Sequence, residues 1–282
     1  MQKVILTIAF LCWTLSYLHG QKDPTQRIYM TVPIDDVTTM DITEVTIAQW
    51  VYFIININFN PDHFPDTSSI SYSARNFFDD LKEGPNFHYI EVVNNKGLLK
   101  DNYGINGFRL TKKFKDIEDA DTNYFSISIP IVGISFEQAK AFCKWREYTV
   151  NKSRDVKIRV TLPSIEIYKK VNPNKDSLCK AELNCDSCSN YQFNYLHSKC
   201  TLSAKHKDNV TQGQGLLRAD SYWPTILGLY NIQGNASEMT FTEGVAVGGS
   251  FRHFANESYS DKAQTYKKPE DWLGFRCLIT IQ

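Results

Sequence analysis

The stretch Gly228-Leu229-Tyr230-Asn231-Ile232-Gln233-Gly234-Asn235 is one of five short segments from which the fold of this 282-residue chain can be predicted. Three segments precede it and one follows it. In chain order these are Thr43 to Trp50; Pro130 to Ala139 with Ala141-Phe142-Cys143; Arg159 to Tyr168; and Gly248-Gly249-Ser250-Phe251 with Gly274-Phe275-Arg276. Each segment alone is weak evidence, but their order and spacing over residues 40–282 make them informative together.

Local patterns around these segments predict short helices followed by scattered strands. Thr46 and Gln49 have the spacing of a capping box, and the apolar run 50–57 continues it as a buried helix. Ser135 and Gln138 form a second capping box, which opens an amphipathic helix to about Tyr148. A third short helix begins at Pro163-Ser164, and strands are expected at 40–45, 157–162, 245–251 and 274–281. This order predicts an α+β fold with much irregular structure.

Taken together, the five segments resemble the formylglycine-generating enzyme (sulfatase-modifying factor) family. The resemblance implies a single domain with a C-type-lectin-like fold and few regular elements. We therefore expect a lead-in at 21–39 and the family domain at 40–282, with a loop-rich insertion at about 58–128 and a Cys-rich insertion at about 172–205.

The first residues have the layout of a secretory signal peptide. A basic start with Lys3 precedes the apolar stretch 4–18, and His19-Gly20-Gln21 opens a polar region. That stretch is too short for a membrane span, which needs about 20 apolar residues. We expect cleavage after residue 20, no transmembrane segment in the mature chain, and a location in the periplasm, at the cell surface or outside the cell.

The charge balance argues against nucleic acid as a partner. The chain has 31 basic and 31 acidic residues, so it lacks the excess of positive charge by which proteins bind the phosphate backbone.

Six cysteines lie beyond the predicted signal peptide, and an even number in an exported chain indicates disulfides. The family resemblance implies that Cys143 pairs with Cys277. Cys179, Cys185, Cys188 and Cys200 form a separate cluster, for which we favour two disulfides of undetermined pairing. The spacings Cys185-x-x-Cys188 and His197-x-x-Cys200 also suit zinc, and a Cys-x-x-Cys redox site is a third possibility.

Enzymes of the family that this sequence resembles oxidise a substrate cysteine to formylglycine. They use copper(I), which is held by two cysteines that follow Gly-Gly-Ser. Soft thiolates select copper(I). The corresponding positions here are His253 and Ser258, and no cysteine lies between Cys200 and Cys277. We therefore expect no copper cofactor and regard loss of the family chemistry as the better hypothesis.

A structural calcium site is implied by the resemblance at Asn235, Ala236 and Glu238, since side-chain and backbone oxygens suit this cation. Ser237 and Met239 occupy positions where the family has Trp, and the alternative is an uncharged turn with a capping Asn. A second calcium site is expected at Asn194 and Asp208.

These observations lead to three hypotheses about function. The first is a non-catalytic structural or binding protein of the cell envelope, similar to envelope proteins of bacterial gliding and secretion machines, with protein partners. The second is a formylglycine-generating or related oxidoreductase that acts on a protein cysteine. The third is a calcium-dependent glycan-binding module.

Overall fold

The structure is a computed structural model. It describes residues 30–57, 60–71, 74–75, 78–79, 82, 90–92, 108–110, 128–152, 156–172, 193–194, 215–222, 224–254, 257–259 and 262–282. The predicted signal peptide, the cysteines of the 179–200 cluster and Asp208 lie outside these residues. Within the described part, no helix is long and apolar enough to cross a membrane.

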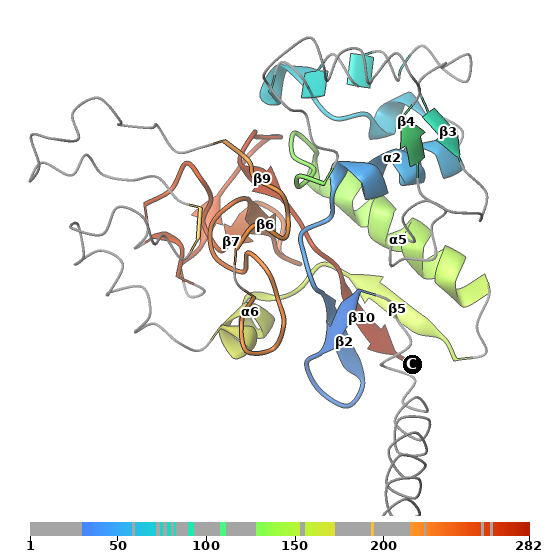
Figure 1. The fold of residues 1–282 in the computed structure, drawn as a ribbon. Coiled ribbons are helices and arrows are strands. Elements are labelled where there is room, and N and C mark those ends of the chain that lie inside the picture. Colours follow the sequence, from blue (N-terminus) through green and yellow to red (C-terminus); the bar gives the residue numbers. More distant parts are fainter. Residues whose placement is uncertain are drawn as a thin grey trace, which may run out of the picture.

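One antiparallel sheet brings together distant parts of the chain. Its order is β1-β2-β10-β5, with β1 at Thr31–Pro33, β2 at Thr38–Asp41, β10 at Leu278–Ile281 and β5 at Ile158–Thr161. Ile279 of β10 pairs with Thr39 on one side and Val160 on the other. The C-terminal strand is therefore central to this sheet (Figure 1).

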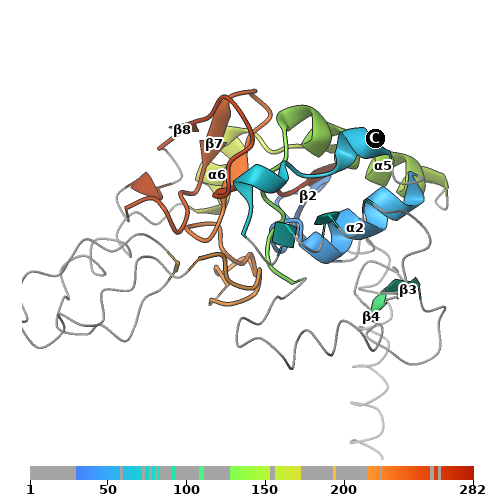
Figure 2. The same ribbon diagram turned by 90° about the horizontal axis from the view of Figure 1, so that it is seen from above.

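A second four-stranded sheet lies beside the helices (Figures 1 and 2). Its order is β8-β7-β6-β9, with β8 at Gln264–Thr265, β7 at Val245–Val247, β6 at Ser237–Met239 and β9 at Leu273–Gly274. A separate antiparallel ribbon joins β3 (Ile90–Val92) and β4 (Phe108–Leu110). This ribbon and the 3₁₀ turns at Pro61–His63 and Thr67–Ser69 are the regular structure described within the expected 58–128 insertion, apart from short helical pieces near residues 74–82.

Both predicted capping boxes are present and begin the two main helices. In α2 (Ile47–Asn56), the Thr46 hydroxyl accepts from Gln49 N, and the Gln49 side chain accepts from Thr46 N. In α5 (Phe136–Lys152), Ser135 and Gln138 make the same reciprocal pair. These bonds satisfy backbone donors that the helix itself leaves free. The third helix, α6 (Ile165–Val171), follows Ser164 as expected.

An aromatic core joins the two helices to the C-terminal segment. Trp50 of α2 stacks on Phe142 of α5 with ring centroids 5.7 Å apart, and Phe142 meets Phe275 edge-on at 5.4 Å. Trp50 and Phe275 are fully buried. The aromatic contacts add about 0.5–1.5 kcal/mol per pair to the burial of apolar area, and so hold α2 and α5 against each other and against the segment that follows β9.

The prediction of one continuous C-terminal strand at 274–281 is wrong. It divides into β9 and β10, which belong to different sheets, and Phe275, Arg276 and Cys277 cross between them. Similarly, the strand expected at 245–251 ends at Val247, because Gly248 and Gly249 take positive φ values of 89° and 65°. The strand expected at 40–45 ends at Asp41. Both sheets therefore meet near Arg276.

Candidate functional site

The turn after β7 positions His253, the first of the two residues expected to correspond to the copper ligands of the family that the sequence resembles. Ser250 is fully buried, and its Oγ lies 2.7 Å from Nδ1 of His253. The same hydroxyl accepts from the backbone N–H of Arg252 at 3.1 Å. The His253 ring lies edge-on to Trp272, with centroids 4.8 Å apart. The imidazole is thus held on two sides by the protein.

Ser258 occupies the second position and is fully buried. It packs directly against Gly249, where an added Cβ would lie 2.1 Å from the Ser258 Oγ and 2.8 Å from its Cα. The Ser258 hydroxyl donates to the carbonyl of Phe254 at 3.3 Å. His253 and Ser258 therefore both contact the short segment Gly249-Ser250, so the structure brings the two predicted positions together.

The described side chains do not fit copper(I). The pair consists of an imidazole whose Nδ1 is bonded to a hydroxyl and a buried serine hydroxyl, neither of which is the soft thiolate donor that copper(I) selects. The described cysteines, Cys143 and Cys277, are buried between α5 and the crossing segment.

An open pocket of about 420 Å³ lies next to this pair. It is lined by His253, Glu257, Lys262, Ala263, Gln264 and Thr265. Burial lowers the pKa of His253, against the attraction of the nearby Glu257 carboxylate. The imidazole is therefore neutral near pH 7, and the charged groups of the pocket are Glu257 and Lys262.

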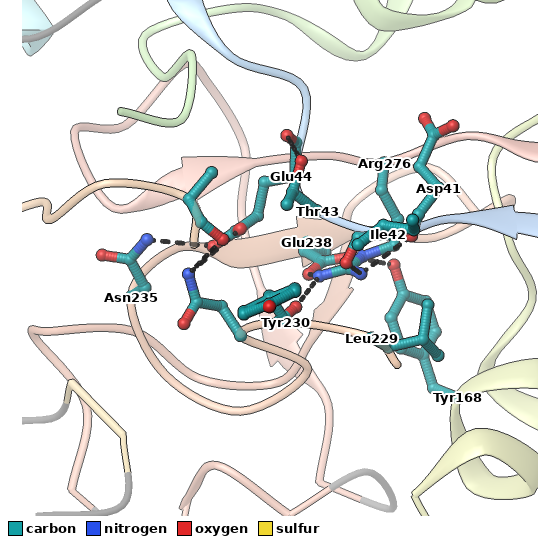
Figure 3. A network of polar contacts seen from close by, with 12 residues as sticks. Asp41, Ile42, Thr43, Glu44, Tyr168, Leu229, Tyr230, Asn235, Glu238 and Arg276 are labelled. Atoms are coloured by element: carbon teal, nitrogen blue, oxygen red, sulfur yellow. Dashed lines mark hydrogen bonds and ion pairs between the residues drawn. The ribbon is translucent and has the colours of Figure 1, made fainter. Parts of the chain in front are cut away.

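The predicted calcium ligands lie elsewhere, in a buried polar network (Figure 3). Both carboxylate oxygens of Glu238 accept from Arg276, at 2.6 Å from Nε and 2.5 Å from Nη2, and the Tyr168 hydroxyl donates to Glu238 at 2.5 Å. The Asn235 Oδ1 accepts from Leu217 N at 2.9 Å and from Asn194 Nδ2 at 3.3 Å. These contacts leave the side-chain oxygens of Asn235 and Glu238 engaged with protein donors.

A calcium site built on Asn235, Ala236 and Glu238 does not fit this arrangement. A guanidinium that binds both oxygens of Glu238 would repel a divalent cation at the same carboxylate. Asn194, expected in the second calcium site, belongs to the same network and donates to the Gly215 carbonyl at 3.0 Å. Its expected partner Asp208 lies outside the described residues.

Glu44 is a second buried carboxyl in this network. It accepts from Asn235 Nδ2 at 3.0 Å and from Asn231 Nδ2 at 3.3 Å. Burial raises its pKa to about 8; Arg276 opposes this rise and the Glu238 charge adds to it. One guanidinium thus faces two carboxyls, and Glu44 is the one that keeps its proton near pH 7.

The two described cysteines lie side by side. Their sulfur atoms are 3.6 Å apart, and both are free buried thiols in the structure. Burial, with the adjacent Cys143 thiol, raises the pKa of Cys277. The structure thus brings the predicted pair into contact, while the disulfide itself stays a prediction, as do the pairings of Cys179, Cys185, Cys188 and Cys200.

The sequence did not single out the buried Arg276 and Glu44, or Lys262 in the wall of the pocket. Arg276 and Glu44 each stand between apolar or small residues within a quoted segment, and a charge in such a setting signals a buried ionic partner. Lys262 gave no such signal, because a lysine in a polar loop is ordinary surface.

A family model described as the sulfatase-modifying factor enzyme 1-like domain matches residues 20–281. The chain belongs to this family. Its single α+β domain is the fold that the five segments predicted. Among curated proteins, none matches the chain significantly.

Three solved structures are similar to this family member at low identity. CarF is 15% identical, with a TM-score of 0.46 and coverage of 87% of each chain. Treponema denticola variable protein 1 is 12% identical, with a TM-score of 0.45, and the match covers 86% of this chain and 84% of that one. PvdO from Pseudomonas aeruginosa is 14% identical, with a TM-score of 0.38; the match covers 56% of this chain and 64% of PvdO.

Proposed function

We propose that this protein is an exported binding protein of the cell envelope that uses the sulfatase-modifying factor fold without copper-dependent oxidation of cysteine. The observation that carries the proposal is the pair His253 and Ser258. Both contact the Gly249-Ser250 segment, yet one is bonded to the Ser250 hydroxyl and the other is buried under Gly249. Neither offers copper(I) a thiolate, while an open polar pocket beside them remains accessible to a ligand.

Replacing both residues by cysteine tests whether the missing chemistry resides in these two positions. We expect the wild-type protein to take no copper(I) from the chelator bicinchoninate under anaerobic conditions with ascorbate, which keeps the copper reduced and leaves the predicted disulfides intact. The double variant His253→Cys/Ser258→Cys is expected to withdraw about one copper(I) per chain, because the two side chains meet the same segment and thiolates select this ion. The single variants are the matched controls, and each is expected to bind copper(I) far more weakly.

Turnover is the outcome that contradicts the proposal. The wild-type protein is incubated with copper and a synthetic peptide that carries the cysteine of a sulfatase motif, and the peptide is followed by mass spectrometry. Conversion of the cysteine to an aldehyde by the wild-type protein would restore the oxidoreductase hypothesis. A double variant that binds no copper would show that the change extends beyond residues 253 and 258.

Export and partners are tested in the source cells. We expect the mature chain to begin at Gln21, to be recovered in the envelope or secreted fraction, and to crosslink reproducibly to a defined protein complex. Recovery of the uncleaved chain in the cytoplasm would contradict export.

A glycan array, probed with the same preparation with and without chelator, tests the calcium-dependent glycan hypothesis. The engaged oxygens of Asn235 and Glu238 do not favour this hypothesis.

A further inference from the structure

The pocket beside His253 holds two opposite charges that do not pair with each other. Glu257 and Lys262 both line it and both are exposed. Among the residues that the structure describes, Lys262 has no ion-pair partner, and the Glu257 carboxylate accepts one backbone N–H, that of Phe254, at 2.8 Å. Two opposite charges that line one pocket without pairing with each other suit a ligand that carries both signs.

Gln264 ties the backbones of these two residues together. This largely buried side chain forms part of the pocket wall, and its Nε2 donates to the Glu257 carbonyl at 2.6 Å and to the Lys262 carbonyl at 3.2 Å. Its Oε1 accepts from Gly249 N at 3.3 Å. The backbones of both charged residues are thus tied to the Gly249-Ser250 segment, and the pocket is preorganised.

The hydrogen bonds of Ser250 determine which nitrogen of His253 carries the proton. The Ser250 Oγ already accepts from Arg252 N, so its own buried proton needs an acceptor. Within the described residues, that acceptor is Nδ1 of His253, at 2.7 Å. A neutral imidazole that accepts at Nδ1 carries its proton at Nε2. His253 therefore adds a fixed neutral donor to the pocket, beside the Lys262 ammonium and the Thr265 hydroxyl.

We propose that this pocket binds a small zwitterion with a primary ammonium and a carboxylate, namely a free amino acid or a short peptide. The ligand carboxylate would contact Lys262 with help from His253 and Thr265, and its ammonium would contact Glu257. A volume of about 420 Å³ lies in the range of small-ligand pockets. The inference rests on the proposed function, because it assigns a ligand to the site where the family has copper chemistry.

The test compares three forms of one dipeptide with the mature protein, residues 21–282, by isothermal titration calorimetry. The probes are Ala-Ala, its N-acetyl form, which lacks the ammonium, and its amide form, which lacks the carboxylate. We expect Ala-Ala to bind at least about tenfold more tightly than either blocked form, which corresponds to about 1.4 kcal/mol. Free alanine in parallel distinguishes an amino-acid site from a peptide site.

Two variants assign each end of the ligand to a residue. Lys262→Met keeps the aliphatic stem, and it is expected to abolish the preference for Ala-Ala over the amide form. Glu257→Gln keeps an acceptor for Phe254 N, and it is expected to abolish the preference for Ala-Ala over the acetylated form. Lys267→Met is the control, since this exposed lysine does not line the pocket, and it is expected to bind like the wild type.

Three outcomes would overturn the inference: no binding of alanine or Ala-Ala, equal binding of the blocked forms, or unchanged preferences in both pocket variants. These failures are distinct from failure of the proposed function, which is measured by copper(I) uptake and peptide oxidation. If the protein binds no zwitterion and oxidises no peptide, the inference about the ligand is wrong and the proposed function stands.

Discussion

Replacement of Arg276 by methionine is expected to lower the free energy of unfolding by about 3–5 kcal/mol, a large part of the stability of the domain. The side chain is fully buried, binds both oxygens of Glu238, and donates to the carbonyls of Asp41 at 3.1 Å and Tyr230 at 2.8 Å. It therefore joins β2, β6 and the segment around Tyr230 at the point where the chain crosses between sheets (Figure 3). Removal of one partner leaves a buried carboxylate without compensation, which costs about 3–5 kcal/mol, against a total stability of about 5–15 kcal/mol.

A second variant shows whether the loss of stability is specific to the buried arginine or follows the removal of any arginine that binds a carboxylate. Arg252 also binds a carboxylate through two nitrogens, that of Asp271, but the pair is partly exposed. Arg252→Met is expected to cost about 1 kcal/mol or less, because exposed ion pairs are screened by water. Urea denaturation followed by circular dichroism measures both. Equal and small losses in the two variants would mean that the Arg276 pair does not hold the sheets together.

A double variant tests whether the loss of stability in Arg276→Met comes from the buried Glu238 carboxylate, which is left without a cationic partner. Glu238→Gln/Arg276→Met removes both charges, and it is expected to be more stable than Arg276→Met alone. Replacing a buried ion pair by uncharged groups is often nearly neutral, whereas breaking one half is not. If the double variant is no more stable, the loss in Arg276→Met arises instead from the carbonyls of Asp41 and Tyr230 that are left without donors.

The sequence predicts those features of the fold that depend on neighbours a few positions apart. The helix starts at Thr46 and Ser135 are examples, since each capping box closes hydrogen bonds within three residues. The crossing at Phe275 to Cys277 could not be predicted in this way. Its geometry depends on partners more than 200 positions away, such as Asp41, and period-two patterning continues through it as if it were one strand.

The family resemblance predicts the positions of the candidate site, whereas the contacts of its side chains are known only from the structure. Positions 253 and 258 follow from counting beyond Gly-Gly-Ser, but the sequence does not show that the Ser250 hydroxyl faces the His253 ring or that Ser258 packs on Gly249. The surroundings of the predicted calcium ligands could not be predicted for a related reason. Asn235 and Glu238 have suitable oxygens, yet the donors that engage them come from Leu217, Arg276 and Tyr168, which are between 18 and 70 positions away in the sequence.

The free energy of unfolding is expected to fall as the pH rises from about 4.5 to about 8, because of Glu44. Its folded-state pKa of about 8 exceeds the ordinary value of 4.5, so over this window the folded protein holds a proton that the unfolded chain releases. The contribution of Glu44 is fully present below pH 4.5 and is lost as the pH passes through 8. Each tenfold change in proton affinity corresponds to about 1.4 kcal/mol, so the loss is on the order of 4 kcal/mol.

Glu44→Gln isolates this effect, because the amide never ionises and keeps an acceptor for Asn235 Nδ2. The difference in stability between wild type and variant should shift in favour of the variant across pH 4.5–8, measured by urea denaturation at several pH values. The lowered pKa of His253 acts in the opposite sense, since the folded state disfavours its protonation, but it is common to both proteins and cancels in the difference. Glu137→Gln, at an exposed position on α5, is the control and should follow the wild-type profile. A difference that does not change with pH would mean that Glu44 is ionised in the folded protein, and that Arg276 compensates both carboxylates of the network at once.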